Sequence, residues 1–215
     1  MARQAATRRS ERPRVTRIAL TFDAEHPDRS AWSQANAGRI LDELAEAGIR
    51  CTFFVQSRWA EAEPVIARRI AAEGHLIGNH SAYHARMTML SDEGVRSDVG
   101  HAERTIATIT GADTKPWFRC PFGDGYEDER VLSLLDGIGY RNVHWNVEPA
   151  DWEPSRTASD VAHDTTAGAL EHGDGAVVLL HTWPDATSGA IASIVDGLTR
   201  AGATFVTVDE LDALP

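Results

Sequence analysis

Two histidines four residues apart, His80 and His84, have the spacing of a pair of metal ligands. Residues i and i+4 share one face of a helix, so both imidazoles could reach the same ion. Catalytic zinc sites commonly combine two histidines with one carboxylate and keep a fourth position open for water. Asp23 or Glu25, which follow an apolar run, could supply that carboxylate. The histidines could equally be polar residues of a loop, so the pair alone does not establish a metal site.

Further ionisable side chains end or directly follow other β-prone runs of the sequence. These side chains are Arg119, Glu148, Asp151 and His181. The carboxyl ends of parallel strands meet at one rim of a barrel or sheet, which is where such folds place their functional groups. We therefore expect these groups to line one cavity together with the two acids at 23 and 25.

The elements that would position these groups alternate regularly along the chain. Seven runs of four to seven residues have strand character, at 17–22, 51–55, 75–78, 116–119, 141–146, 175–181 and 204–208. Amphipathic helical patterns lie between them, at 35–48, 63–74, 91–111, 128–139, 157–173 and 186–202. This alternation predicts an α/β fold of parallel strands joined by right-handed crossovers, either an open sheet or a barrel.

The composition limits the classes of partner. A formal net charge of −11 over 215 residues argues against a nucleic-acid surface, which needs Lys and Arg to displace counterions, and against binding to anionic lipid. No apolar run approaches the length of a membrane span or of a signal-peptide core, so we expect a cytoplasmic protein with no membrane partner. We expect residues 1–14 to form a disordered basic tail and 15–215 to form a single catalytic domain.

With these residues in view, the sequence resembles the polysaccharide deacetylases with the NodB homology domain, carbohydrate esterase family 4. The resemblance extends from Arg17 to Leu214 and depends on five motifs whose order and spacing are far more specific than any one of them. The motifs are LTFDAEH (20–26), HSAYH (80–84), RCPFG (119–123), EPADW (148–152) and LLH (179–181). The resemblance implies a distorted (β/α)7-type barrel, which agrees with the seven expected strands.

The resemblance also implies a role for each motif residue. His80 and His84 would hold a divalent metal ion, with zinc expected and cobalt, manganese or nickel as alternatives. Asp23 would be the general base for a metal-bound water, and His181 would be the general acid that protonates the leaving amine. Four residues would assist them: Arg119 would orient the base, Asp151 would hold the acid, the backbone N–H of Phe122 would stabilise the oxyanion, and Trp152 would form a pocket wall.

The first motif departs from the family pattern at one position. The family usually has two consecutive aspartates, the base and then a metal ligand, and the second position here is Ala24. Glu25 is the natural substitute, since residues 23 and 25 of a strand project to the same side. We therefore expect Asp23 as the base and Glu25 as the metal ligand. The alternatives are that Asp23 binds the metal and Glu25 lies outside the site, or that the enzyme is metal-poor and impaired.

Several residues have a plainer structural interpretation. Asp151 could cap the loop before a helix, Arg119 could form a structural ion pair, and His181 could be a buried histidine. Cys120, beside the motif arginine, is expected to pack rather than to bind metal. The histidines outside the motifs are interpreted as structural or surface residues: His26, His75, His101, His144, His163 and His172.

Together these features predict a metal-dependent hydrolase of carbon–nitrogen bonds that removes an N-acetyl group from an amino sugar or a polysaccharide. Trp183, bulky and close to the acid in sequence, is expected to reshape the pocket, so a small N-acylated molecule is an alternative to a polymer. Hydrolysis of a cyclic imide or ureide and a non-catalytic carbohydrate-binding module are two further alternatives. The sequence does not determine the oligomeric state.

Overall fold

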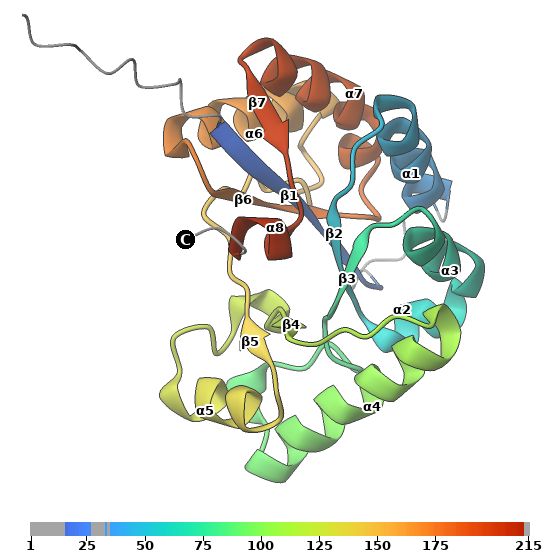
Figure 1. Cartoon of the computed structure of the whole chain (residues 1–215), viewed down its shortest axis with the longest axis vertical. Helices are drawn as coiled ribbons and strands as arrows, with labels where there is room; N and C mark the ends of the chain where they lie inside the picture. The colour runs from blue at the N-terminus through green and yellow to red at the C-terminus, as the bar shows by residue number, and fades with distance from the viewer. Residues whose placement is uncertain (1–15, 27–32, 34, 213–215) are drawn as a thin grey trace, which may run out of the picture.

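A computed structural model of the chain describes residues 16–26, 33 and 35–212, and shows one sheet surrounded by helices (Figure 1). The seven strands are β1 (Thr16–Ala24), β2 (Thr52–Val55), β3 (Leu76–Asn79), β4 (Trp117–Phe118), β5 (Arg141–Asn142), β6 (Ala176–His181) and β7 (Ala203–Phe205). The order across the sheet is β5-β4-β3-β2-β1-β6, with β7 paired to the start of β1, and every pairing is parallel. The basic tail expected at 1–14 lies outside the described residues.

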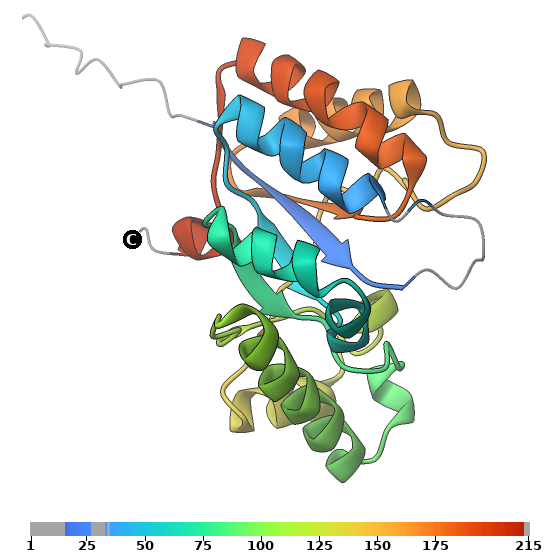
Figure 2. The same cartoon turned by 90° about the vertical axis from the view of Figure 1, so that its right-hand side faces the viewer.

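Helices follow most strands and cover the outside of the sheet. They are α1 (Ala35–Ala47), α2 (Ser57–Ala62), α3 (Pro64–Ala72), α4 (Asp92–Thr110), α5 (Glu129–Gly137), α6 (Ala158–His172), α7 (Asp185–Arg200) and α8 (Val208–Asp212), with short 3₁₀ helices η1 (Met87–Met89) and η2 (Pro121–Gly123). Helix α7 packs between α1 and α6 on one side of β1, and α4 lies at the other end of the molecule (Figure 2). Among the described helices, none is long and apolar enough to cross a membrane.

The segment that follows the edge strand β5 links the two edges of the curled sheet. After β5 it crosses to the opposite edge, where Val147 forms a parallel bridge with Val178 of β6. The backbone N–H of Leu179 donates to the carbonyl oxygen of Val147 at 2.9 Å. The two edges of the sheet are therefore linked, and the expected (β/α)7-type barrel is confirmed as a parallel-strand, curled half-barrel.

All seven expected strands and all six expected helices are present, with three differences. The strands β4 and β5 are only two residues each, because the chain leaves the sheet early to enter the loops of the site. The strand expected at 204–208 ends at Phe205, and α8 begins at Val208 instead. Helices α2 and α8 were not expected, since five or six residues are too few to show a helical period.

Strand β1 runs through the centre of the core and delivers both acids to the site. Every residue from Ile18 to Ala24 is buried, as in a parallel strand covered on both faces. The register pairs Asp23 with Phe54 of β2 on one side and with His181 of β6 on the other. The expected base and the expected acid are therefore neighbours on adjacent strands.

Candidate metal centre and active site

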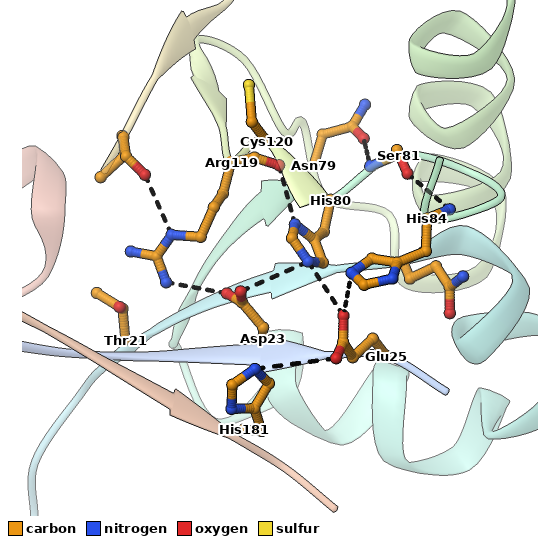
Figure 3. A network of polar contacts seen from close by, with 12 residues as sticks. Thr21, Asp23, Glu25, Asn79, His80, Ser81, His84, Arg119, Cys120 and His181 are labelled. Carbon is orange, nitrogen blue, oxygen red and sulfur yellow. Dashed lines mark hydrogen bonds and ion pairs between the residues drawn. The ribbon is translucent and has the colours of Figure 1, made fainter. Parts of the chain in front are cut away.

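Three side chains with metal-binding atoms meet at the carboxyl end of the sheet (Figure 3). Glu25 follows β1 directly, and its Oε2 lies 3.2 Å from His80 Nε2 and also contacts His84 Nε2. One ligand atom from each residue lies within 4.8 Å of the other two. A tetrahedral zinc ion with bonds of about 2.0–2.1 Å holds its ligand atoms about 3.3 Å apart. The three residues therefore fit one divalent cation.

The two histidines converge through a loop, and the expectation that they share a helix face is wrong. The segment between β3 and η1 is irregular, and Ser81 and His84 have φ values of +66° and +54°. The Ser81 backbone N–H donates to Asn79 Oδ1, and the Ser81 hydroxyl accepts from the His84 backbone N–H. These turns bring the two imidazole centroids to 5.0 Å. The i, i+4 spacing pointed to the site, but the conformation behind it is a turn.

A buried acid of α4 holds this loop in place. The carboxylate of Asp98 accepts hydrogen bonds from the backbone N–H groups of Ala82, at 2.8 Å, and Tyr83, at 3.3 Å. Asn79 ties the start of the loop to the same helix, since its side-chain amide donates to the Val99 carbonyl oxygen at 3.0 Å. The turn that carries both histidines is therefore also held by two side chains outside the five motifs, those of Asn79 and Asp98.

The hydrogen bonds of His80 leave one ring nitrogen available to a cation. Its Nδ1 lies 2.9 Å from the backbone carbonyl oxygen of Arg119, which can only accept, so Nδ1 carries a proton. Its Nε2 faces Glu25 and lies 3.5 Å from Asp23 Oδ2. Burial lowers the pKa of His80, but the two carboxylates more than offset this and raise it. Negative surroundings that retain a proton here also favour a metal ion.

Glu25 keeps its negative charge although it is buried. Burial by itself raises the pKa of this carboxyl group. Hydrogen bonds from His80 and His84, together with the charges of His84 and His181, outweigh the burial and hold the pKa well below its usual range. An ionised carboxylate is the form that a metal ligand requires.

Asp23 is bound by an arginine instead. Its Oδ1 accepts a hydrogen bond from Arg119 Nη1 at 2.9 Å, and both residues are buried. The guanidinium of Arg119 stacks on the ring of Phe54 at 4.1 Å and donates from Nε to the Val143 carbonyl oxygen at 3.1 Å. Asp23 therefore lies beside the three candidate metal ligands without belonging to that group.

His181 is held by Asp151, as the motifs imply. His181 Nδ1 lies 2.8 Å from Asp151 Oδ1, while Asp151 Oδ2 accepts from the His181 backbone N–H at 2.7 Å and from the Thr187 hydroxyl at 2.5 Å. Burial lowers the pKa of His181, but the charge and hydrogen bond of Asp151 outweigh it and raise the pKa to about 9. The capping role considered for Asp151 is wrong, because Thr157 caps the following helix, α6.

These groups open into one pocket of about 350 Å³. Of the expected residues, its lining includes Asp23, Glu25, His84, Phe122, Trp152, His181 and Trp183. Glu148, which was expected at the same rim, also lines it, whereas three further lining residues were not expected there from the sequence: His26, Trp145 and Leu179. His26 was interpreted as structural or surface, although its position next to Glu25 could have revealed it.

The third motif, RCPFG (119–123), contributes a wall of the pocket and brings its backbone close to the indole of Trp145. The ring of Phe122 packs on the imidazole of His84 with centroids 4.3 Å apart. Gly123 has φ +67°, and a Cβ atom there would lie 3.1 Å from the ring of Trp145, so glycine allows this turn to approach the indole. The thiol of Cys120 points away from the acids in Figure 3. Burial raises its pKa to about 12, which agrees with a packing role.

Comparison with known proteins identifies the family. A family model described as polysaccharide deacetylase matches residues 10–143. The chain belongs to the polysaccharide deacetylase family. This membership confirms the resemblance inferred from the five motifs, and at the level of the family it confirms the expectation of a deacetylase-type hydrolase of non-peptide carbon–nitrogen bonds.

Named relatives of this deacetylase-family chain act on two kinds of amino sugar. It is 28% identical over 195 residues to the peptidoglycan-N-acetylmuramic acid deacetylase PdaA of Bacillus subtilis, covering 90% of the chain and 70% of the relative. It is 35% identical over 164 residues to a chitooligosaccharide deacetylase of Rhizobium leguminosarum bv. trifolii, covering 76% of the chain and 70% of the relative.

A solved structure of the same family has the same fold. It is a family 4 carbohydrate esterase from Streptomyces lividans in complex with acetate, 27% identical to this chain. The TM-score is 0.76, and the match covers 88% of this chain and 91% of the esterase. The shared fold supports the barrel described above.

Proposed function

We propose that this deacetylase-family protein is a metal-dependent hydrolase that removes the acetyl group from N-acetylated amino sugars. The observation that carries the proposal is the meeting of a Glu-His-His cluster with an arginine-bound Asp23 and an aspartate-bound His181 in one pocket. The relatives named as chitooligosaccharide and peptidoglycan deacetylases support the same reaction.

Glu25, His80 and His84 would hold the cation. When bound, a divalent cation supplies Lewis acidity, which makes a water molecule more acidic and polarises the acetyl carbonyl. Two imidazoles and one carboxylate suit zinc, and also accept cobalt, manganese or nickel. We assign Glu25 rather than Asp23 as the carboxylate ligand, because Arg119 already engages Asp23 and both histidines face Glu25.

The other polar residues move and hold protons. Asp23, oriented by Arg119, accepts a proton from the attacking water, whose oxygen forms a bond to the acetyl carbon. The carbon–nitrogen bond then breaks while His181 Nε2 gives its proton to the departing nitrogen. Asp151 holds the other ring nitrogen, so Nε2 is the one directed to the pocket, 3.9 Å from Glu25 Oε1. The products are acetate and a free amino sugar.

Three aromatic residues would shape the substrate position. The backbone N–H of Phe122 is our assignment for stabilising the oxyanion that forms on the acetyl oxygen. Trp152 and Trp183 line the pocket, and the ring of Trp183 lies 5.8 Å from that of His181. A wall of indoles beside the acid suits the apolar face of a sugar ring.

Acetate release and metal content, measured on the same preparation, test the proposal. We expect about one divalent ion per chain by elemental analysis, and acetate release from chitooligosaccharides that a chelator removes and zinc restores. His84→Ala should lose both, while His172→Ala, an exposed histidine of α6, should retain both. Metal-independent hydrolysis, or turnover of a cyclic imide without any acetate release, would refute the proposal. Sugar binding with no hydrolysis would instead support the non-catalytic alternative.

The single-domain layout, the cytoplasmic location and the native metal stay predictions from the sequence.

A further inference from the structure

A carboxylate that takes no part in the chemistry above is fixed in the pocket wall. Glu148 lines the same pocket as Asp23 and His181 and is exposed to solvent. One of its oxygens, Oε2, accepts a hydrogen bond from Trp145 Nε1 at 3.0 Å, and the other, Oε1, accepts from Trp152 Nε1 at 3.3 Å. Because both oxygens are held, this carboxylate stays in the wall instead of turning into solvent.

The charge of Glu148 is not neutralised by its partners. Both donors are uncharged indole N–H groups, and no residue in the described part of the chain forms an ion pair with it. The nearby Arg119, 5.6 Å from the ring of Trp145, is already paired with Asp23. A substrate that enters the pocket therefore meets an unpaired negative charge beside two indole rings.

We propose that Glu148 selects neutral N-acetylglucosamine-type sugars over N-acetylmuramic acid, an inference that rests on the proposed deacetylase function. N-acetylmuramic acid is N-acetylglucosamine with an added lactyl ether, and that ether carries a carboxylate. The hydroxyl groups of a neutral sugar can donate to the free lone pairs of Glu148, whereas a second carboxylate is repelled. The overall net charge of −11 repels an anionic polymer as well.

Three substrates of equal length separate charge from size. They are a chitooligosaccharide, an oligomer that contains N-acetylmuramic acid, and the same oligomer with its lactyl carboxylate converted to an amide. We expect kcat/KM for acetate release to be about tenfold lower for the acid than for the amide, the size of effect that one repulsive charge pair gives near a protein surface. Added salt should raise kcat/KM for the acid selectively, because ions screen the repulsion.

Two variants test the residue itself. Glu148→Gln should raise the acid-to-amide ratio of kcat/KM several-fold. Glu153→Gln, which removes an exposed carboxylate that does not line the pocket, should leave the ratio unchanged. The salt dependence of the unaltered protein tests whether charge repulsion acts at all, and the difference between the two variants assigns that repulsion to Glu148.

Three results would overturn the inference. The acid could be hydrolysed as well as the amide, the amide could be rejected as strongly as the acid, which would mean exclusion by size, or the acid could show no salt dependence. All three leave the proposed function intact, because acetate is still released. Absence of acetate from every substrate would instead refute the proposed function, and the inference with it.

Discussion

Two acids that are two residues apart, Asp23 and Glu25, have different partners, and this difference supports the roles that we propose for them. Arg119 holds Asp23, and two imidazoles face Glu25. Ala24 between them is fully buried in the main hydrophobic cluster, on the opposite face of the strand. An acid at position 24 would enter that core, which supports our proposal that the carboxylate at 25 takes the place of the missing aspartate.

The pH dependence of activity tests the pairing of His181 with Asp151. A general acid must be protonated, so activity is lost as pH rises through its pKa, which the charge of Asp151 raises against the effect of burial to about 9. We expect Asp151→Asn to move the alkaline limb of the kcat/KM profile towards lower pH and to reduce the maximum rate. A bound cation would shift the alkaline limb to lower pH in both proteins. The quantity to measure is therefore the difference in pH between the two alkaline limbs.

Thr187→Val is the matched control for this comparison. It removes one hydrogen bond to Asp151 but keeps the negative charge, so its alkaline limb should stay close to that of the unaltered protein. An unchanged limb in Asp151→Asn would contradict the assignment of His181 as the acid.

At the scale of elements, the site depends on how loops leave the strands. The motif spacing located His80 and His84, but nothing in the letters HSAYH predicts left-handed backbone at two residues that are not glycine. Trp145 was not assigned to the pocket, because the strand expected at 141–146 ends at Asn142 and Trp145 lies in an irregular segment with no period to indicate which way its side chain points. The presence and order of the strands can be predicted from hydropathy, whereas the exact ends of short strands and the loop conformations depend on tertiary hydrogen bonds.

The contact of α4 with the histidine loop predicts a distant effect on metal binding. In Asp98→Ala, the backbone N–H groups of Ala82 and Tyr83 lose their acceptor, so the turn that carries both imidazoles loosens. We expect the metal dissociation constant, measured by calorimetry, to rise about tenfold. Glu93→Gln, an exposed acid of the same helix, should change nothing. Equal affinities in both variants would show that the loop holds its shape without α4.

Close packing around Phe54, on which Arg119 stacks, predicts that Gly78 of β3 does not tolerate a larger side chain. A Cβ atom at Gly78 would lie 2.6 Å from the ring of Phe54, on which the guanidinium of Arg119 stacks. We expect Gly78→Ala to lower the free energy of unfolding by about 1–3 kcal/mol and to reduce kcat through displacement of Arg119. Gly137→Ala, where a Cβ atom meets nothing within 4 Å, should leave the activity unchanged. Denaturant unfolding and acetate release measure both effects.

At the scale of the whole molecule, alternating strand and helix patterns were sufficient to predict the fold. Parallel strands joined by helices leave few topologies, and the five motifs placed the functional groups at one end of the sheet. The length of β4 and β5 and the closure at Val147 could not be predicted, because they depend on packing between segments far apart in sequence. The sequence thus predicts which strand ends form the site, and the folded chain determines the walls around it.

Because the proposed metal ligands follow separate strands, a bound cation should stabilise the entire fold. Glu25 follows β1, while His80 and His84 follow β3, so the ion would connect two segments that separate on unfolding. At a zinc concentration one hundred times the dissociation constant, the free energy of unfolding should rise by about 2.7 kcal/mol. His84→Ala should show a much smaller increase. An equal increase in the free energy of unfolding in both proteins would mean that zinc binds at another site.

The most direct test of the account is the position of the ion in crystals grown with zinc, located by anomalous diffraction at the zinc edge. We expect one strong peak about 2.0–2.2 Å from a Glu25 oxygen, His80 Nε2 and His84 Nε2, with Asp23 still bound to Arg119. A peak coordinated by Asp23 with Glu25 turned away, or no peak between the two histidines, would contradict it.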